Sequence, residues 1–308
     1  MDISIQNPEQ EKKDEVFDIN KIGFVILHYL VFETTKKCVE SIMESVDTNQ
    51  YCIIIVDNGS GNGSGEKLQA LYKGHDNITV VLNSQNLGFA RGNNVGFKYA
   101  KEIEKCDFIC MMNNDTILEQ KDFSQSIVNE YKNYDCAVMG PQVLMSDNTV
   151  ILQARKLGTV KMYQRELLRL HIAEFMIKFG IDISVFPKLV RKILKKEIKA
   201  YFPVSVENGI IENVVLEGCC LIFTPIYLRM FDGIDDRTFM YREEELLYVR
   251  LMKHHLKSLY SEKIHIKHLE DVSTDSAMTS DREKKKFIYK NEIQSLKILI
   301  LEMQSVKM

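Results

Sequence analysis

Residues 52–60 read CIIIVDNGS, an apolar run of five residues that ends directly in four polar or small ones. A short apolar run rich in β-branched residues is typical of a strand that is buried on both faces. Three more runs of this kind lie nearby: IGFVIL (22–27), ITVVL (78–82) and FICMM (108–112). The four runs predict four strands of one buried sheet.

Stretches with helical spacing separate these runs. They cover Thr34–Val46, Glu66–Tyr72 and Asn93–Glu104. A regular alternation of strand and helix implies parallel strands joined by right-handed crossovers. We therefore predict an α/β fold, an α/β/α sandwich with a mostly parallel central sheet. Ligands of such sheets bind at the carboxyl ends of the strands, where Asp57–Ser60 and Asn113–Asp115 lie.

The composition narrows the class of protein. The chain has 308 residues, 40 Lys and Arg against 43 Asp and Glu, a formal net charge of −3 and 45% apolar residues. These values exclude a largely disordered chain, because enough apolar surface is present to build a core. They also argue against a dedicated nucleic-acid-binding protein, which usually carries a clear basic excess. We expect no nucleic-acid partner.

The cysteines and the first residues both indicate a cytoplasmic protein. The seven Cys are odd in number and lie mostly within apolar runs, which is typical of buried thiols in a reducing compartment. Residues 1–20 are polar and lack the pattern of a signal peptide, and no stretch of about 18 apolar residues could span a bilayer. We expect residues 1–20 to form a loosely ordered arm.

The middle of the chain is basic. Residues 155–199 hold 12 Lys and Arg but 4 Asp and Glu, and include the amphipathic segments LLRLHIAEFMIKFG (167–180) and FPKLVRKILKKEIK (186–199). Two surface helices with solvated basic faces are the slightly favoured interpretation. The alternative is a contact with an anionic membrane surface, made by apolar stripes with basic flanks.

Strand character returns after Val214. The runs VVLEGCCLIFTP (214–225) and KIHIKH (263–268) predict further strands, and residues 281–303 predict one amphipathic helix. The predicted apolar side of that helix consists of Phe287, Ile288, Ile293, Leu296, Ile300 and Leu301.

Two motifs are suited to a nucleotide, each with a plainer alternative. The Asp57 carboxylate, in the turn Asp-Asn-Gly-Ser, could accept a hydrogen bond from a nucleobase, but an ordinary strand-to-helix turn explains it equally well. In NLGFARGNN (86–94), small residues and Arg91 suit a diphosphate at a helix N-terminus, while a loop with helix-capping Asn residues is the alternative. The segment GNGSG (61–65) lacks the Lys-Ser/Thr of a phosphate loop, and no Rossmann fingerprint follows the first strand.

Acidic residues indicate a metal site and a general base. Asp115, after two Asn, offers the hard oxygen ligands that Mg²⁺ or Mn²⁺ prefers, with an Asn-rich turn as the alternative. Glu243–Glu245 stand at a predicted helix start, where the helix dipole alone favours acids, yet one of them could act as a base. His265 and His268 point to opposite faces of their strand, so one could join Asp115 at a metal or both could be surface residues.

Taken in order, these residues resemble the family 2 glycosyltransferases of the GT-A fold, in particular the rhamnosyltransferase-like branch of bacterial polysaccharide enzymes. The resemblance covers about Lys21–Ser273. It is carried by Tyr29, Glu33, VDNGS (56–60), NLGFARGNN (86–94), NND (113–115), EGC (217–219), FDGIDDRTFMYREEE (231–245), Arg250 and His268.

This resemblance implies a nucleotide-sugar donor, linked to UDP or dTDP, and Mn²⁺ or Mg²⁺ as cofactor. Asp57 would read the nucleobase, Asp115 would be the metal ligand, and His268 would approach the metal. The remaining donor-side residues that it implies are Tyr29, Glu33, Asn86, Arg91 and Asn114.

On the acceptor side, the resemblance implies direct inversion at the anomeric carbon, with Glu244 as the catalytic base. Gly218 and Glu243 would bind the acceptor. Two residues depart from the family's pattern: Leu30 stands where an Asn usually follows the Tyr, and Leu246 stands where an acid often follows the base. Whether these departures impair activity stays open.

We expect the protein to transfer a sugar to a saccharide or lipid-linked saccharide in bacterial surface polysaccharide synthesis. A non-catalytic relic that binds nucleotide sugars or glycans is the alternative. A nucleotidyltransferase is disfavoured, because His28–Phe32 replace the glycine-rich basic loop that such enzymes carry after the first strand. Peripheral contact with the anionic inner membrane face and a homodimer stay open.

The chain is expected to divide into five parts. They are a polar arm (1–20), a nucleotide-sugar-binding half (21–140), a helical basic insertion (141–213), an acceptor-binding and catalytic half (214–273) and a C-terminal helix (274–308).

Overall fold

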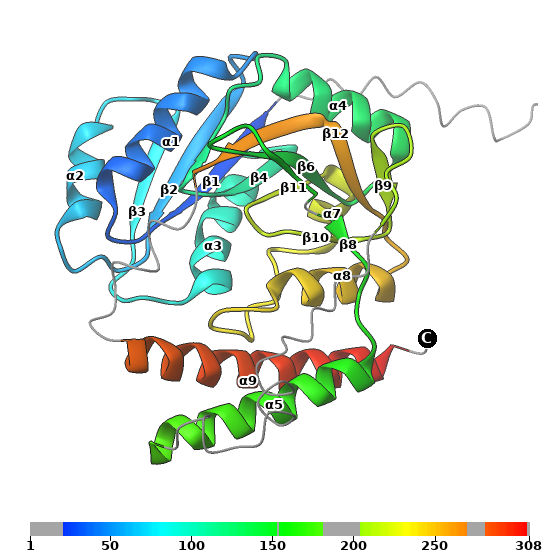
Figure 1. Cartoon of the computed structure of the whole chain (residues 1–308). Helices are drawn as coiled ribbons and strands as arrows, with labels where there is room; N and C mark the ends of the chain where they lie inside the picture. Colours follow the sequence, from blue (N-terminus) through cyan, green and yellow to red (C-terminus); the bar gives the residue numbers. More distant parts are fainter. Residues whose placement is uncertain (1–20, 153, 181–203, 270–280, 307–308) are drawn as a thin grey trace, which may run out of the picture.

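Four parallel strands from the first third of the chain form one half of a large sheet (Figure 1). The computed structural model describes residues 21–152, 154–180, 204–269 and 281–306. Strand β1 (Ile22–His28) pairs in parallel with β2 (Tyr51–Asp57) and β4 (Phe108–Asn113), and β3 (Ile78–Leu82) extends the sheet beyond β2. Most of their residues are buried on both faces, which explains the continuous apolar runs.

The second half of the sheet mixes parallel and antiparallel pairs. Strand β11 (Cys220–Phe223) lies antiparallel between β4 and β6 (Val138–Met145), and β12 (Ser258–His268) runs parallel to β6. The short strands are β5 (Thr116–Ile117), β7 (Val150–Ile151) and β9 (Ile210–Glu212) at the sheet and β8 (Ala154–Arg155) and β10 (Val215–Leu216), which pair with each other. The predicted α/β sandwich is confirmed.

Helices cover both faces of the sheet. One apolar core joins the sheet to α1 (Phe32–Ser45), α2 (Ser64–Leu71) and α4 (Phe123–Tyr134). The core on the other face joins it to α3 (Phe89–Lys98), α7 (Pro225–Met230) and α8 (Glu243–Lys253).

Two glycines bring α3 very close to the sheet. A Cβ on Gly96 would lie 2.5 Å from Cγ1 of Val25, and one on Gly92 would lie 2.7 Å from Cδ1 of Leu27. The helix begins at Phe89, four residues earlier than the sequence predicts, and continues into a π-helical turn (Tyr99–Ile103). Part of the small-residue pattern in NLGFARGNN therefore serves helix packing.

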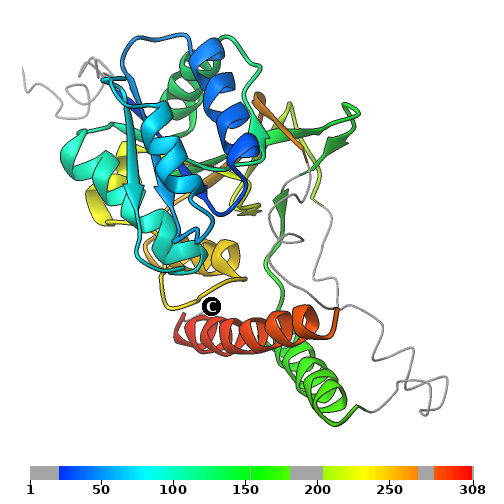
Figure 2. The same cartoon turned by 90° about the vertical axis from the view of Figure 1, so that its left-hand side faces the viewer.

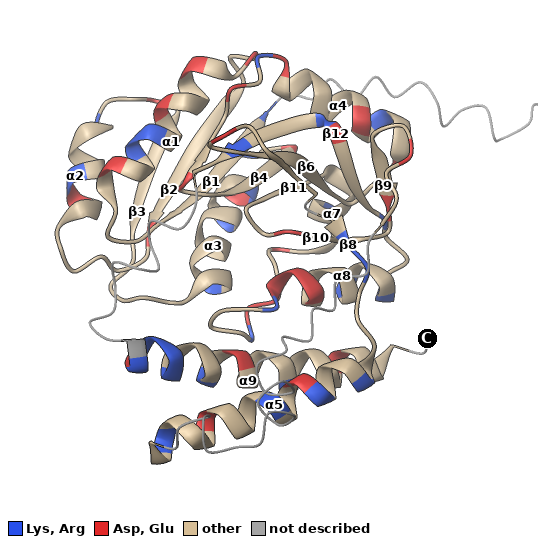
Figure 3. Cartoon of the chain, in the orientation of Figure 1, with Lys and Arg blue, Asp and Glu red and all other residues tan. Residues whose placement is uncertain are grey.

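Helices α5 (Val160–Phe179) and α9 (Asp281–Ser305) lie side by side against α8 (Figures 1 and 2). Lys and Arg gather along α5 and at the start of α9 (Figure 3). On α9 the buried residues include Ile293, Leu296 and Ile300 as predicted, but Leu301 is 67% exposed and Leu299 is buried in its place. Residues 296, 299, 300 and 303 recur every three or four positions, which defines the buried stripe.

The predicted helical insertion (141–213) is only partly helical. Helix α5 lies in it, but residues 141–145 belong to β6, and β7, β8 and β9 also fall within its limits. Residues 141–145 belong to the sheet because β6 pairs with β12, which lies more than a hundred residues away in sequence. The segment 186–199 and the arm 1–20 lie outside the described residues. Among the described helices, none is long and apolar enough to cross a membrane.

Candidate active site

A pocket of about 250 Å³ lies where several elements meet at the edge of the sheet. It receives side chains from the start of α3, the end of β4, the β10–β11 connection, the start of α8 and the end of β12. Its lining residues are Phe89, Asn113, Glu217, Gly218, Cys219, Glu244 and His268. Three of the residues that the sequence singled out, Gly218, Glu244 and His268, thus meet in one pocket.

Asp115 and His268 lie beside each other although 153 positions separate them in sequence (268 − 115). Strand β5 pairs with β12 so that Thr116 is opposite His268, and the Leu269 N–H donates to the Asp115 carbonyl. Nε2 of His268 lies 3.2 Å from Oδ1 of Asp115. The residue pattern left His265 and His268 as candidates and the resemblance favoured His268, which the structure brings to Asp115.

This pair fits a divalent cation that keeps part of its shell for a substrate. Oδ1 of Asp115 is buried and accepts no hydrogen bond of good geometry from the described residues. Among all the residues that the structure describes, no three His, Cys, Asp or Glu side chains converge as a complete metal site. Mg²⁺ and related ions often take one or two protein ligands and complete their shell with phosphate oxygens and water.

Asn114 lies next to Asp115 but is directed into the protein. Its side chain is buried, and its amide nitrogen donates to Oγ1 of Thr35 at 2.9 Å. This contact ties the turn after β4 to the first turn of α1.

Asp57 ends β2 with a buried carboxylate that faces its own turn. The Ser60 N–H donates to both carboxylate oxygens at 3.2–3.3 Å, and a Cβ on Gly65 would lie 2.5 Å from Cγ of Asp57. The Ser60 N–H therefore holds the carboxylate, and Gly65 leaves room for it. Its role in reading a nucleobase stays a prediction.

His28, which the sequence analysis missed, connects the first turn of α1 to the start of α2. Its Nδ1 lies 2.7 Å from Oγ1 of Thr35 and its Nε2 lies 2.7 Å from Oγ of Ser64. Burial lowers the pKa of His28 to about 4, although the nearby Asp57 carboxylate opposes the shift. The ring is therefore neutral near pH 7, with one nitrogen donating and the other accepting. A His at the end of an apolar strand was the available signal.

Two donor-side residues predicted by the resemblance lie at the surface near the start of α1. Tyr29 is partly buried directly after β1, and Glu33 is exposed in the first turn of α1. Between them, Leu30 has a φ angle of 66°. Its N–H donates to Oγ of Ser60, and its carbonyl accepts from the Asn62 amide.

The motif NLGFARGNN (86–94) braces the loop that precedes α8, and its role at a diphosphate stays a prediction. Asn94 exchanges two hydrogen bonds of 2.9 Å with the backbone of Ile234. The Nε of Arg91 donates to the Asp236 carbonyl at 3.0 Å. Asn94 is buried, whereas Arg91 is exposed and accessible to a ligand. The physical reason is that the loop brings unpaired backbone groups, which these side chains satisfy.

The start of this motif is held by a residue that the sequence analysis missed. Asn58 donates to Oδ1 of Asn86 at 3.0 Å and to the Gly88 carbonyl at 3.1 Å. Asn86 is otherwise exposed at the end of its loop. The Phe89 N–H donates to the Phe239 carbonyl. Hydrogen bonds therefore connect the loop after β2, the motif and the loop before α8.

The three glutamates at the start of α8 have three different environments. Burial alone would raise the pKa of Glu245, but the guanidinium groups of Arg155 and Arg242, each 3.1 Å away, hold it below its usual value. Burial raises the pKa of Glu243 to about 7, and its carboxylate accepts from Oγ1 of Thr238. Burial and the neighbouring Glu245 and Glu243 raise the pKa of Glu244 well above its usual value. Only Glu244 faces the pocket.

Arg242 joins three elements around this helix start. Its guanidinium donates to Glu166 of α5, Glu245 of α8 and Glu292 of α9, at 2.9–3.1 Å. Arg242 and Tyr241 have φ angles of 70° and 76°, in the left-handed region that bulky side chains rarely adopt. The ion pairs hold this strained turn directly before Glu244.

Two neighbours shape the space around Glu244. A Cβ on Gly218 would lie 2.6 Å from Oε1 of Glu244, so position 218 gives room to the carboxylate. Glu217 lines the same pocket and binds Nε of Arg155 at 2.8 Å. The sequence analysis quoted EGC but did not assign Glu217 to the site, because a single acid beside a Gly carries no specific pattern.

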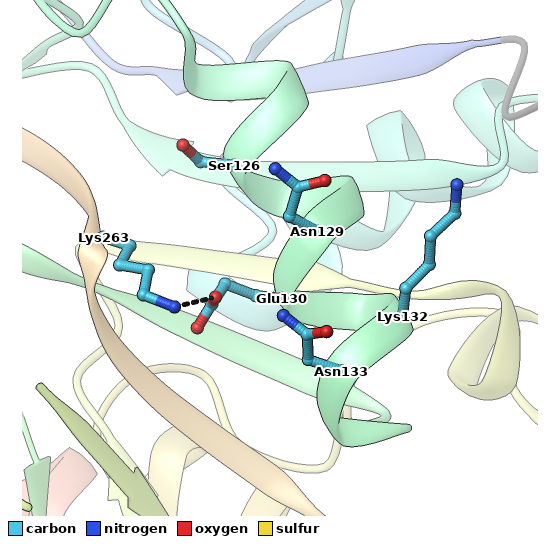
Figure 4. Close-up of a pocket in the computed structure, with 6 residues that line it drawn as sticks. All are labelled: Ser126, Asn129, Glu130, Lys132, Asn133 and Lys263. Atoms are coloured by element: carbon cyan, nitrogen blue, oxygen red, sulfur yellow. Dashed lines mark hydrogen bonds and ion pairs between the residues drawn. The ribbon is translucent and has the colours of Figure 1, made fainter. Parts of the chain in front are cut away.

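A second pocket, of about 280 Å³, lies on α4 and β12 and contains none of these residues (Figure 4). Its buried acid, Glu130, accepts from Nζ of Lys263 at 3.0 Å and from Oγ of Ser261 at 2.8 Å. Both of its oxygens are thus used within the fold.

The sheet order, the helices on both faces and the position of the pocket define the GT-A fold. The family model described as "Glycosyl transferase family 2" matches residues 24–188, more than half of the chain. The chain therefore belongs to glycosyl transferase family 2. The family and fold that the sequence resemblance implied are confirmed.

Among the solved structures, one shares the fold of this chain and a second resembles it less. The crystal structure of GalNAc-T7 with UDP, GalNAc and Mn²⁺ has a TM-score of 0.53 and 11% identity, and covers 82% of this chain and 44% of that one. The chain thus spans less than half the length of that protein. The crystal structure of S. aureus TarS 1-349 has a TM-score of 0.49 and 11% identity, and covers 88% of this chain and 71% of that one. A comparison with curated proteins gave no match.

Proposed function

We propose that the protein is an inverting, metal-dependent glycosyltransferase that uses a nucleoside-diphosphate sugar. The observation that carries this proposal is the meeting of Glu244 and His268 in one pocket, with Asp115 3.2 Å from His268. Such a transfer requires a carboxyl group that can take a proton and a pair of side chains that can hold a cation. Membership of the family supports the same reaction.

Glu244 is the proposed general base. Its raised pKa suits proton transfer from an acceptor hydroxyl near neutral pH. Such a base contributes about 10²–10⁴ in rate, or roughly 3–5 kcal/mol of the barrier. Because the attacking hydroxyl and the leaving group lie on opposite faces of the sugar, the configuration at the anomeric carbon inverts.

Asp115 and His268 are proposed to hold Mn²⁺ or Mg²⁺. The cation would act as a Lewis acid that offsets the negative charge of the departing diphosphate. The presence of both UDP and Mn²⁺ in the crystal structure of GalNAc-T7 supports a metal of this kind. Asp115 keeps one buried oxygen available for this purpose.

The donor side is proposed to be the half that contains residues 21–140. Asp57 reads the nucleobase of a UDP- or dTDP-linked sugar, with Tyr29 and Glu33 beside it. Asn86, Arg91 and Asn114 complete this side. Arg91 is exposed in the first turn of α3 and suits the diphosphate.

The acceptor side is proposed to lie around α8. Glu243 and Gly218 flank Glu244 there, and Gly218 acts by leaving space for it. We propose a saccharide or lipid-linked saccharide acceptor, in a rhamnosyltransferase-like step of bacterial surface polysaccharide synthesis. The protein would then work in the cytoplasm, as a peripheral protein at the anionic inner membrane face, because its middle region is basic.

Donor turnover tests the proposal. UDP-, dTDP- and GDP-linked sugars are incubated with Mn²⁺ or with EDTA, and free nucleotide is measured for wild type, Glu244→Gln, Asp115→Ala and the surface control Glu40→Gln. We expect turnover of one donor class only with metal. Glu244→Gln should lose turnover but keep its thermal shift with nucleotide, and Asp115→Ala should lose the metal-dependent part of that shift.

Two outcomes would contradict the proposal. Equal turnover in wild type and Glu244→Gln would exclude Glu244 as the base. Nucleotide binding without any turnover of these donors, with or without saccharide acceptors, would instead favour the non-catalytic relic.

A further inference from the structure

The outer face of α5 carries an apolar stripe that no other described element covers. Leu168, Phe175 and Phe179 are 63%, 54% and 60% exposed, and Ile172 is exposed beside them. The spacing of 4, 3 and 4 residues places all four on one face of the helix. The rings of Phe175 and Phe179 contact each other at a centroid distance of 4.5 Å. Apolar side chains gathered in this way mark an interaction surface.

The charges that border the stripe are positive. Lys161, Arg165 and Lys178 are exposed on the same side of α5, and Nζ of Lys178 lies 5.8 Å from the Phe179 ring. Of the two glutamates of α5, Glu166 is buried against Arg242, and Glu174 lies 3.8 Å from His171, which can carry a positive charge. An apolar stripe with cationic borders is the pattern of helices that lie in the surface of an anionic bilayer.

The basic start of α9 extends this surface. A guanidinium nitrogen of Arg282 donates to the Ile177 carbonyl at 2.9 Å, which fixes the start of α9 beside the end of α5. Lys285 and Lys286 are exposed in the same turn of α9, whose start is basic in Figure 3. The positive charge therefore concentrates where the aromatic pair is exposed.

We propose that the outer face of α5 docks the protein on an anionic lipid bilayer. Phe175 and Phe179 enter the boundary between headgroups and acyl chains, while Lys161, Arg165 and Lys178 contact lipid phosphates. Because α9 packs on α8 and α5 packs on α9, the membrane lies on the side of α8 that faces away from the sheet (Figure 1). This inference rests on the membrane location in the proposed function and names the surface that provides it.

Vesicle sedimentation tests this docking face. The full chain is mixed with phosphatidylcholine vesicles with or without phosphatidylglycerol, at low and high salt. We expect binding only with phosphatidylglycerol, and weaker binding at high salt because the charges are screened. Phe175→Ser with Phe179→Ser should weaken binding roughly tenfold or more. Lys161→Gln, Arg165→Gln and Lys178→Gln should each weaken it about fivefold.

Ile103→Ser is the matched control, because Ile103 is also 63% exposed but lies on the turn after α3. It should bind vesicles as wild type does, and thermal unfolding confirms that each variant is folded. Absence of binding by wild type, or equal binding by the double Phe variant, overturns the proposal. Self-association that the double Phe variant abolishes, without vesicle binding, also overturns it and assigns the stripe to a second copy of the chain. Donor turnover without vesicles reports the transferase proposal separately.

Discussion

Oε1 of Glu244 occupies the space in which a side chain at position 218 would begin, because a Cβ on Gly218 would lie 2.6 Å away. The carboxyl group that we propose as the base is therefore positioned by the absence of a side chain on the β10–β11 connection. This relationship makes the position of Glu244 sensitive to a single methyl group.

Gly218→Ala should reduce turnover with little effect on nucleotide binding. The new methyl group displaces the carboxyl, and a displacement of about 1 Å costs on the order of 10² in rate. Steady-state kinetics measure kcat, and a thermal-shift titration measures nucleotide binding. Gly61→Ala is the control, because nothing lies within 4 Å of a Cβ there. An unchanged kcat in Gly218→Ala would show that the position of Glu244 is not critical.

Glu244→Gln should stabilise the fold above neutral pH while it removes activity. The folded-state pKa of Glu244 lies above its ordinary value of 4.5, so the folded state binds more protons than the unfolded state between these two pKa values. The wild type therefore loses stability as pH rises through this window, and the Gln variant does not. Urea unfolding at pH 5 and pH 8 should show a gain of roughly 1–3 kcal/mol at pH 8 and a smaller one at pH 5. Equal unfolding free energies at pH 8 would contradict the raised pKa.

Leu30→Asn should stabilise the protein. A Leu with φ of 66° carries a strain of about 1–2 kcal/mol, and Asn adopts this region more readily. The contacts of position 30 with Ser60 and Asn62 use its backbone, so the substitution keeps them. We expect a gain of about 1 kcal/mol in the free energy of unfolding. Leu71→Asn, at an exposed position at the end of α2, is the control and should give no gain in stability. A loss of stability in Leu30→Asn would mean that the Leu30 side chain contributes more to stability than relief of the backbone strain.

Arg242→Ala should destabilise the fold strongly. Three carboxylates, Glu166, Glu245 and Glu292, lose their shared cation, and breaking such a buried arrangement costs about 3–5 kcal/mol. Without the cation the pKa values of Glu245 and Glu292 rise, so protonation relieves the repulsion and the loss should be smaller at pH 5 than at pH 8. Urea unfolding at the two pH values measures the difference. Arg165→Ala, on the exposed side of α5, should change the stability little. A loss independent of pH would exclude the electrostatic explanation.

Much of the sheet could be predicted from the sequence because each strand has a local signature. Strands β1, β2 and β4 are buried on both faces, so their apolar runs are nearly continuous, whereas β3 at the sheet edge is only partly buried. Strand β6 was missed, because VMGPQVLM includes Gly140 and Pro141, residues typical of turns. A Cβ on Gly140 would lie 2.8 Å from the Leu216 side chain, so packing against a distant strand requires this glycine.

The sequence predicted those site residues whose type has a specific chemical use. It predicted less well the residues whose side-chain direction depends on the conformation of a loop. Asp115 and His268 were both proposed as metal ligands, and they lie together. Asn94 was grouped with a diphosphate motif, but it binds Ile234, which is 140 positions away. Hydrogen bonds of this kind depend on which loops meet, and a local sequence pattern does not contain that information.

The position of β12 also determines the order in which the site can be assembled during synthesis. The strands β1 to β4 come from the first 113 residues and pair with one another, so this half can form while the rest of the chain is still being made. His268 reaches Asp115 only after β12 has paired with β6 and β5, and the α8 start is held by Glu292 on the last helix. At about 5–20 residues per second, the ribosome adds these segments many seconds after β4. A nascent or prematurely terminated chain that lacks β12 therefore has Asp115 without His268 beside it.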